Sequence, residues 1–158
     1  MNDHQAIELP TTPSDLVAQA EALLAGQTDR VANAANLAAL LYHSLDGVNW
    51  AGFYFLKNGQ LIVGPFQGKP ACVHIPLGRG VCGTAAETRE IQRIADVRAF
   101  EGHIACDAES RSEIVLPLVK NGGLVGVLDI DSPLPDRFSP VDQRLLERIA
   151  QIFVDSID

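Results

Sequence analysis

Cys106 has local surroundings that favour a reactive thiol. It lies in the stretch GHIACDAES (102–110), which has neither a helical nor a strand period. Its neighbours include His103, Asp107 and Glu109, whereas a buried structural cysteine normally has apolar ones. Cysteine reactivity depends on the thiolate fraction, and a polar, glycine-containing loop with a nearby histidine permits a thiolate better than a core does. Cys106 is therefore a candidate nucleophile, and an inert thiol is the alternative.

The other two cysteines, Cys72 and Cys82, are candidates for recycling an oxidised Cys106. A cysteine that becomes a sulfenic acid needs a second thiol close by to be returned to use. Three cysteines without a framework spacing, in a chain expected in a reducing compartment, favour free, catalytic or metal-bound thiols over structural disulfides. Thiol redox chemistry and inert cysteines are both open interpretations at this point.

A zinc site is a third interpretation. Cys72-x-His74 and His103-x-x-Cys106 together offer two sulfurs and two nitrogens, enough for tetrahedral zinc. The single residue between Cys72 and His74 is not the usual spacing of two to four residues. We therefore expect no metal ion.

The segment GRGVCG (78–83) spells the G-x-G-x-x-G pattern of dinucleotide-binding folds. That pattern needs a parallel βαβ unit, whereas the strand expected before this segment belongs to a hairpin-rich region. A tight turn into a helix explains the glycines better, and an anion site at the free N–H groups of that helix is the alternative. We expect no cofactor.

Three carboxylates come from two neighbouring expected strands. Asp129 and Asp131 alternate with apolar residues in LDIDS (128–132), which places both on the face opposite the core. Glu113 begins the adjacent hairpin arm. These residues form either a solvated sheet edge or a polar pocket that holds a cation or keeps one carboxyl protonated.

Two aromatic residues, Trp50 and Tyr54, share one face of the expected strand 49–56 with Gly52. The three residues 51, 53 and 55 share the other, more apolar face. The only tryptophan of the chain is therefore either a pocket wall or part of the core.

Length and composition describe one compact domain of 158 residues, 47% of them hydrophobic. We expect a tail over 1–13 and a single domain over 14–158. The net charge of −8, with scattered basic residues, argues against a nucleic-acid partner. The sequence has no secretory signal pattern and no stretch apolar enough to span a bilayer, so we expect a cytoplasmic protein without membrane contact.

The hydrophobic periods predict an α+β domain with a mostly antiparallel sheet. Ser14, Thr28 and Ser139 are the expected N-caps of three helices, and Asn58-Gly59 is an expected hairpin turn. The predicted apolar stripe of the second helix comprises Val31, Ala34, Ala35, Ala38 and Leu41. The expected helices span 14–25, 28–45, 78–88 and 139–158, and the expected strands span 49–56, 60–66, 71–76, 91–94, 112–119 and 124–131.

Four segments carry a resemblance to a known family: NWAGFY (49–54), GPFQGKPACVHIPLGRGVCGTA (64–85), FEGHIACDAESRSEIVLPL (100–118) and GVLDIDS (126–132). Together they closely resemble the free methionine-(R)-sulfoxide reductases, which are stand-alone GAF domains. The family often has IACV where this chain has PACV (70–73). The resemblance implies a sheet of about six strands with N- and C-terminal helices behind it and loops covering a small pocket.

The resemblance also implies roles. Cys106 looks like the nucleophile, Cys72 the main resolving cysteine and Cys82 an auxiliary thiol. The implied pocket residues are Trp50, Tyr54, Glu113, Asp129 and Asp131. On this hypothesis a carboxylic acid protonates the departing sulfoxide oxygen, and thioredoxin or a similar dithiol reduces the resulting Cys72–Cys106 disulfide.

Restriction to the free amino acid would follow from charge, because a carboxylate can pair with an ammonium group that methionine inside a polypeptide lacks. The preference for the R epimer rests on the resemblance alone. The strongest rival is a non-catalytic GAF domain that senses a small molecule or redox state. A homodimer is a further expectation for this type of domain.

Overall fold

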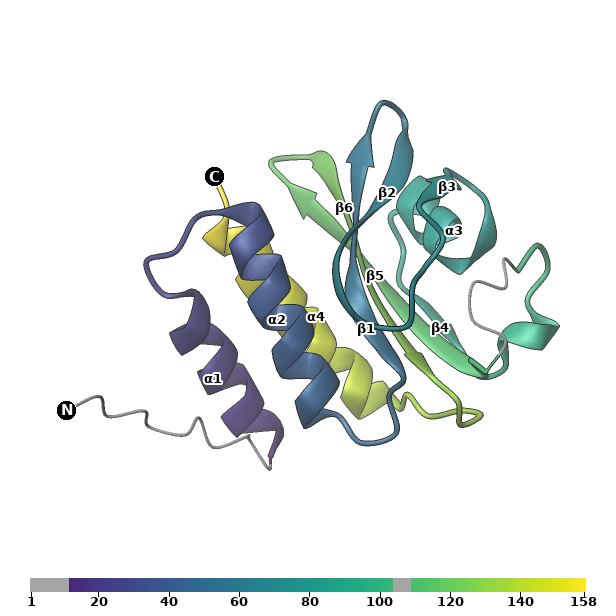
Figure 1. Cartoon of the computed structure of the whole chain (residues 1–158), viewed down its shortest axis with the longest axis horizontal. Helices are drawn as coiled ribbons and strands as arrows, with labels where there is room; N and C mark the ends of the chain where they lie inside the picture. Colours follow the sequence, from purple (N-terminus) through teal and green to yellow (C-terminus); the bar gives the residue numbers. More distant parts are fainter. Residues whose placement is uncertain (1–11, 104–108) are drawn as a thin grey trace.

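Six antiparallel strands form one sheet that lies between two unequal layers of helices (Figure 1). The computed structural model describes residues 12–103 and 109–158. The strand order is β3-β2-β1-β6-β5-β4. The helices are α1 (Pro13–Leu24), α2 (Arg30–Ser44), α3 (Gly80–Thr88) and α4 (Pro140–Ser156), with a 3-10 turn η1 (Val97–Ala99). The strands are β1 (Trp50–Lys57), β2 (Gln60–Gly68), β3 (His74–Pro76), β4 (Gln92–Ile94), β5 (Ser112–Lys120) and β6 (Gly123–Ser132).

Two hairpins build most of the sheet, and their turns explain where the strands reverse. Asn58 and Gly59 have φ values of 52° and 78°, and Asn121 and Gly122 have φ values of 51° and 78°. Positive φ at both central residues is what a two-residue type I′ turn requires, and Asn-Gly adopts it most readily. The predicted turn at Asn58-Gly59 and the predicted α+β class are therefore confirmed.

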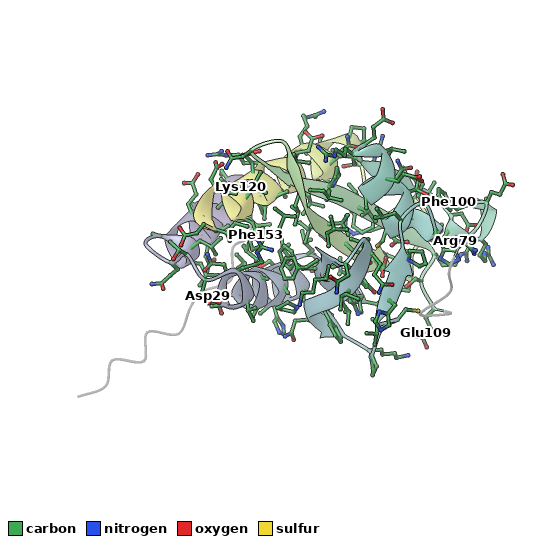
Figure 2. All side chains as sticks on the ribbon, turned by 90° about the horizontal axis from the view of Figure 1, so that it is seen from above. Asp29, Arg79, Phe100, Glu109, Lys120 and Phe153 are labelled. Atoms are coloured by element: carbon green, nitrogen blue, oxygen red, sulfur yellow. The ribbon has the colours of Figure 1, made fainter. Side chains whose placement is uncertain are left out.

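The larger core lies between the sheet and the layer formed by α1, α2 and α4. Phe53 of β1 and Phe153 of α4 meet there with ring centroids 4.7 Å apart, and Figure 2 labels Phe153 within this layer. A smaller core lies on the opposite face, where α3 packs on β5 and β6. In the part of the chain described, no helix has the length and apolarity needed to cross a membrane.

Two of the predicted helix starts are wrong by one or two residues. Thr12, not Ser14, caps α1, because Pro13 fits the first helical position, where its missing N–H costs nothing. Asp29, not Thr28, caps α2 by accepting a hydrogen bond from a backbone N–H of the first turn. The third cap, Ser139, is confirmed and forms a reciprocal capping box at the start of α4.

The predicted apolar stripe of α2 is wrong at two positions. Val31 is 61% exposed, and Ala35 is exposed as well. Ala34, Ala38 and Leu41 are buried as predicted, whereas Leu37 and Leu40 are buried in place of the other two. Alanine-rich helices leave the buried face poorly defined because their apolar positions surround the axis.

Candidate active site

Two adjacent strands place the predicted acidic residues beside one another. In the antiparallel pair of β5 and β6, Glu113 lies directly opposite Asp131. Side chains alternate along a strand, so Asp129 and Asp131 share the face that α3 covers. Leu128 and Ile130 point to the opposite face and belong to the larger core. The predicted alternation along β6 is therefore confirmed.

This acidic face is buried rather than solvated. Glu113 is 7% exposed and Asp129 is 4% exposed. Oδ1 of Asp129 is buried and accepts no hydrogen bond from the described residues. The interpretation as a solvated edge is wrong, because α3 packs over this end of the sheet. Alternation predicts which face a residue takes but does not reveal what covers that face.

Burial raises the pKa values of two of these carboxyls. Burial, followed by the nearby charge of Asp129, raises the pKa of Glu113 well above its usual value. Burial, followed by the charge of Asp131, raises the pKa of Asp129 in the same direction. Raised pKa values keep a carboxyl protonated at higher pH, which is the state a general acid needs.

The carboxyls line a small pocket that is partly open to solvent and has a cavity volume of about 50 Å³. The five residues predicted to form a pocket all line this cavity. The full lining comprises Trp50, Tyr54, Lys69, Pro70, Ala71, Ile75, Arg79, Gly80, Val81, Cys82, His103, Ser110, Glu113, Asp129 and Asp131.

An aromatic stack forms one wall of the pocket. Trp50 is only 3% exposed, and its ring stacks on Phe66 and Tyr54 with centroid distances of 5.1 and 5.7 Å. Its Nε1–H donates to the backbone oxygen of Lys69 at 3.1 Å. Burial, followed by the charge of Asp129, raises the pKa of Tyr54, which keeps its phenol protonated. Both interpretations of Trp50 thus hold in part, because the ring is packed and also lines the cavity.

The ring of Trp50 depends on a glycine beside it. A methyl group at Gly52 would overlap the Cβ of Phe66 and lie 2.8 Å from Trp50. Replacing Gly52 with alanine should therefore lower the free energy of unfolding by about 1–3 kcal/mol, as overpacking does elsewhere. Chemical denaturation measures this change. Gly123→Ala is the matched control, because its new methyl group would meet only the oxygen of Lys120 at 3.5 Å. Equal stability of the two variants would contradict the role of Gly52.

The first turn of α3 forms the wall opposite the sheet. Cys82 lies in this turn, is 5% exposed, and places its Sγ 3.8 Å from Oε1 of Glu113. Burial, followed by the charge of Asp129, raises the pKa of the Cys82 thiol. Ligand atoms of Cys82, Glu113 and Asp129 lie within 4.8 Å of one another, the one such group found among residues 12–103 and 109–158. Cys72 and His74, which were weighed as zinc ligands and set aside, are not part of it.

Basic and polar groups surround the mouth of the pocket. Lys69 forms an ion pair with Glu109 at 3.1 Å, with both side chains mostly exposed. Arg79 precedes α3, and its side chain makes no hydrogen bond that caps the helix. Figure 2 shows Arg79 and Glu109 at the same end of the molecule, far from Asp29 at the other end. The pocket thus has an acidic floor, and its mouth carries Arg79 and the Lys69–Glu109 ion pair.

Comparison with known proteins places the chain in a family. The model of the GAF domain matches residues 19–156. A protein of Escherichia coli (strain K12) named free methionine-R-sulfoxide reductase is 55% identical over 140 residues, which cover 88% of this chain and 85% of that protein. The chain belongs to the free methionine-R-sulfoxide reductase family. Its fold is the GAF fold, so the expected family and architecture are both confirmed.

Solved structures of other family members share the whole architecture. The structure of fRMsr of Staphylococcus aureus in complex with substrate has a TM-score of 0.90 and 50% identity, and the match covers 94% of this chain and 97% of that one. Free methionine-R-sulfoxide reductase of Neisseria meningitidis, also in complex with its substrate, has a TM-score of 0.91 and 39% identity. That match covers 96% of this chain and 94% of the other.

The structure describes two of the three cysteines of this family member. Cys72 is disulfide-bonded, whereas Cys82 is a buried free thiol. Cys106 lies outside the described residues, so its role as nucleophile and its pairing with Cys72 stay predictions. His103 lines the pocket, and burial lowers the pKa of its imidazole, which favours the neutral ring.

Sequence reasoning missed several pocket residues of this reductase-family chain. Lys69 and Arg79 are basic residues on either side of the Cys72 segment, and Ser110 follows the predicted nucleophile. Asn49 donates a hydrogen bond to the hydroxyl of Ser110 at 3.3 Å. Their common signal was proximity in sequence to the cysteines, because loops beside a reactive residue tend to form its surroundings.

Proposed function

We propose that this protein reduces free methionine-(R)-sulfoxide to methionine. Its close relatives of that name support the activity. The structural observation that carries the proposal is the buried acidic floor formed by Glu113 and Asp129, set against the aromatic wall of Trp50. A free amino acid has an ammonium group, a carboxylate and, here, a weakly basic sulfoxide oxygen. Each of these groups has a complementary partner in the pocket.

The charges of the pocket suggest how the substrate is oriented. A carboxylate of the floor pairs with the ammonium group, with Asp129 as the best candidate because it is buried and its Oδ1 accepts no hydrogen bond from the described residues. The substrate carboxylate lies toward the rim, where Arg79 and the N–H groups at the start of α3 attract an anion. The methyl-thio end packs on Trp50. Glu113 remains to face the sulfoxide oxygen.

The chemistry proceeds in two thiol steps. The Cys106 thiolate attacks the sulfoxide sulfur while a protonated carboxyl delivers a proton to the oxygen, which yields methionine and a Cys106 sulfenic acid. The Cys72 thiol then attacks the sulfenic sulfur, and one water molecule leaves as the disulfide forms. An external dithiol such as thioredoxin reduces this disulfide and is itself oxidised. The substrate loses one oxygen atom in each cycle.

Selectivity for the free amino acid tests the proposed orientation. With a dithiol reductant present, free methionine-(R)-sulfoxide should be reduced, whereas the S epimer should not. N-acetyl-methionine-(R)-sulfoxide keeps the sulfoxide and the carboxylate but lacks the ammonium group. We expect its kcat/KM to fall by at least about 10²-fold, because a buried carboxylate is left without its partner. Liquid chromatography with mass detection of the products measures both outcomes, because it also detects the acetylated product.

Two outcomes would contradict this function. A protein that binds the free sulfoxide but forms no methionine would be a sensor, the rival interpretation of this fold. Equal rates with the free and acetylated substrates would contradict the role of the acidic floor. A homodimer and a cytoplasmic location stay expectations, and sedimentation of the purified protein tests the first.

A further inference from the structure

The first turn of α3 is fixed tightly against the end of β3. The N–H of Gly78 donates to the oxygen of Gly83 at 2.8 Å, and the N–H of Arg79 donates to the oxygen of Pro76 at 3.2 Å. A methyl group at Gly83 would lie only 2.5 Å from the oxygen of Pro76. Backbone this close leaves the turn little room to shift. The sulfur of Cys82 therefore has little freedom to leave its place in the pocket.

The thiol of Cys82 already has a partner in that place. Its Sγ lies 3.8 Å from Oε1 of Glu113, and an oxygen of Asp129 lies within 4.8 Å. A thiol is a weak hydrogen-bond donor, but a buried carboxyl has few other donors available. Cys72 is disulfide-bonded while Cys82 is free, so a disulfide at Cys72 does not require the Cys82 thiol.

We propose, on the basis of the proposed function, that Cys82 is a positioning residue. Its S–H donates to Glu113 and orients that carboxyl toward the sulfoxide oxygen. Cys82 itself forms no disulfide during turnover. The family resemblance implied an auxiliary role for Cys82, and the positioning of Glu113 is that role. It differs from a redox role in one chemical respect. A hydroxyl group can replace a hydrogen-bond donor, whereas it cannot replace a thiol that forms a disulfide.

The hydrogen bond should also act on the titration of Glu113. Donation to the charged carboxylate lowers the pKa of Glu113, in opposition to the larger effect of burial. Removing the donor therefore moves the pKa of Glu113 further upward. The charged and titratable groups around Glu113 are Cys82 of α3, Asp129 and Asp131 of β6, Tyr54 of β1, and Lys69, Arg79 and His103 at the rim.

Two substitutions at Cys82 separate the positioning role from a redox role. In Cys82→Ala we expect kcat to fall about tenfold, and the limb of the pH profile that reports Glu113 to move upward by at least about half a unit. Cys82→Ser should restore most of kcat and return the limb toward its wild-type position. Equal losses in the two variants would overturn the proposal, and so would wild-type kinetics in both. Ala86→Gly removes a buried methyl group from α3 outside the pocket, and this control should leave the limb in place.

Mass spectrometry after thiol alkylation gives a second readout. When turnover is quenched with acid and the protein is denatured before alkylation, Cys82 should be alkylated in every chain, whatever the state of Cys72 and Cys106. A Cys82 disulfide in a substantial fraction of the chains would overturn the proposal.

A third measurement does not depend on the proposed function, since it needs no substrate. In the double variant Cys72→Ser/Cys106→Ser, Cys82 is the only thiol, so its S–H stretching band can be read by infrared spectroscopy. Adding Glu113→Leu should move this band to higher frequency, because the donor loses its acceptor. An unchanged band would overturn the hydrogen bond itself. If the band moves but the wild-type protein makes no methionine, the proposed function fails while the hydrogen bond stands.

Discussion

Replacing Cys106 with serine should reduce methionine formation by at least about 10³-fold, while substrate binding persists. A serine hydroxyl has about the size of the thiol, but it is not deprotonated near neutral pH and does not form a sulfenic acid. The remaining thiols cannot substitute for it on the proposed mechanism. Burial raises the pKa of Cys82 well above that of an ordinary thiol, which suppresses its thiolate. Amino-acid analysis with free methionine-(R)-sulfoxide and a dithiol measures the loss.

The matched variant for this experiment is Cys72→Ser. It retains the predicted nucleophile and lacks the predicted resolving thiol. We expect it to release one methionine per chain and then to stop when thioredoxin is the reductant. Continued turnover in Cys72→Ser would assign the resolving role to another thiol. Full activity in Cys106→Ser would refute the assignment of Cys106 as the nucleophile.

Replacing Glu113 with glutamine should lower kcat by about 10²–10⁴-fold, the range typical for loss of a general acid. Glutamine keeps the shape of the side chain and an oxygen that accepts the hydrogen bond from Cys82. It has no proton to deliver to the sulfoxide oxygen at neutral pH. Glu90→Gln is the control, because Glu90 is exposed and does not line the pocket. An equally small effect of both substitutions would show that Glu113 is not the general acid.

The same Glu113→Gln substitution should make the protein more stable at neutral pH. The folded-state pKa of Glu113 is raised, so between the usual and the raised pKa the folded state binds more protons than the unfolded state. The free energy of unfolding therefore falls as pH rises through that window, by about 1.4 kcal/mol per pH unit for a single group. Glutamine does not titrate, and the variant should lose less stability over this range. Urea denaturation from about pH 5 to pH 8 measures the two slopes, and a steeper slope in the variant would contradict this assignment.

Parts of this site could be predicted because strand geometry is strictly periodic. The period of two along β1 and β6 correctly divided Trp50 and Tyr54 from Phe53, and Asp129 from Leu128. The turn at 58–59 was equally predictable, since Asn-Gly has a strong local preference for the required φ values. In each case the decisive information lies within a few consecutive residues.

Other features could not be derived because they depend on contacts between distant segments. Sequence left the acidic face as either solvated or enclosed, and only the packing of α3 on β5 and β6 decided between them. Lys69 and Arg79 reach the pocket from loops, where no period indicates direction. Val31 was misassigned because α2 is rich in alanine, so several faces of the helix were about equally apolar.

The two sides of the sheet carry unequal amounts of buried hydrocarbon, and this asymmetry has an evolutionary consequence. Most large apolar side chains are concentrated between the sheet and the layer of α1, α2 and α4. That half can keep the chain folded while substitutions accumulate around the cavity on the other half. A lineage could therefore exchange the ligand of this scaffold by altering the α3 side alone. In relatives that are no longer selected for catalysis, residues on the α3 side should therefore change fastest. Such relatives should still fold.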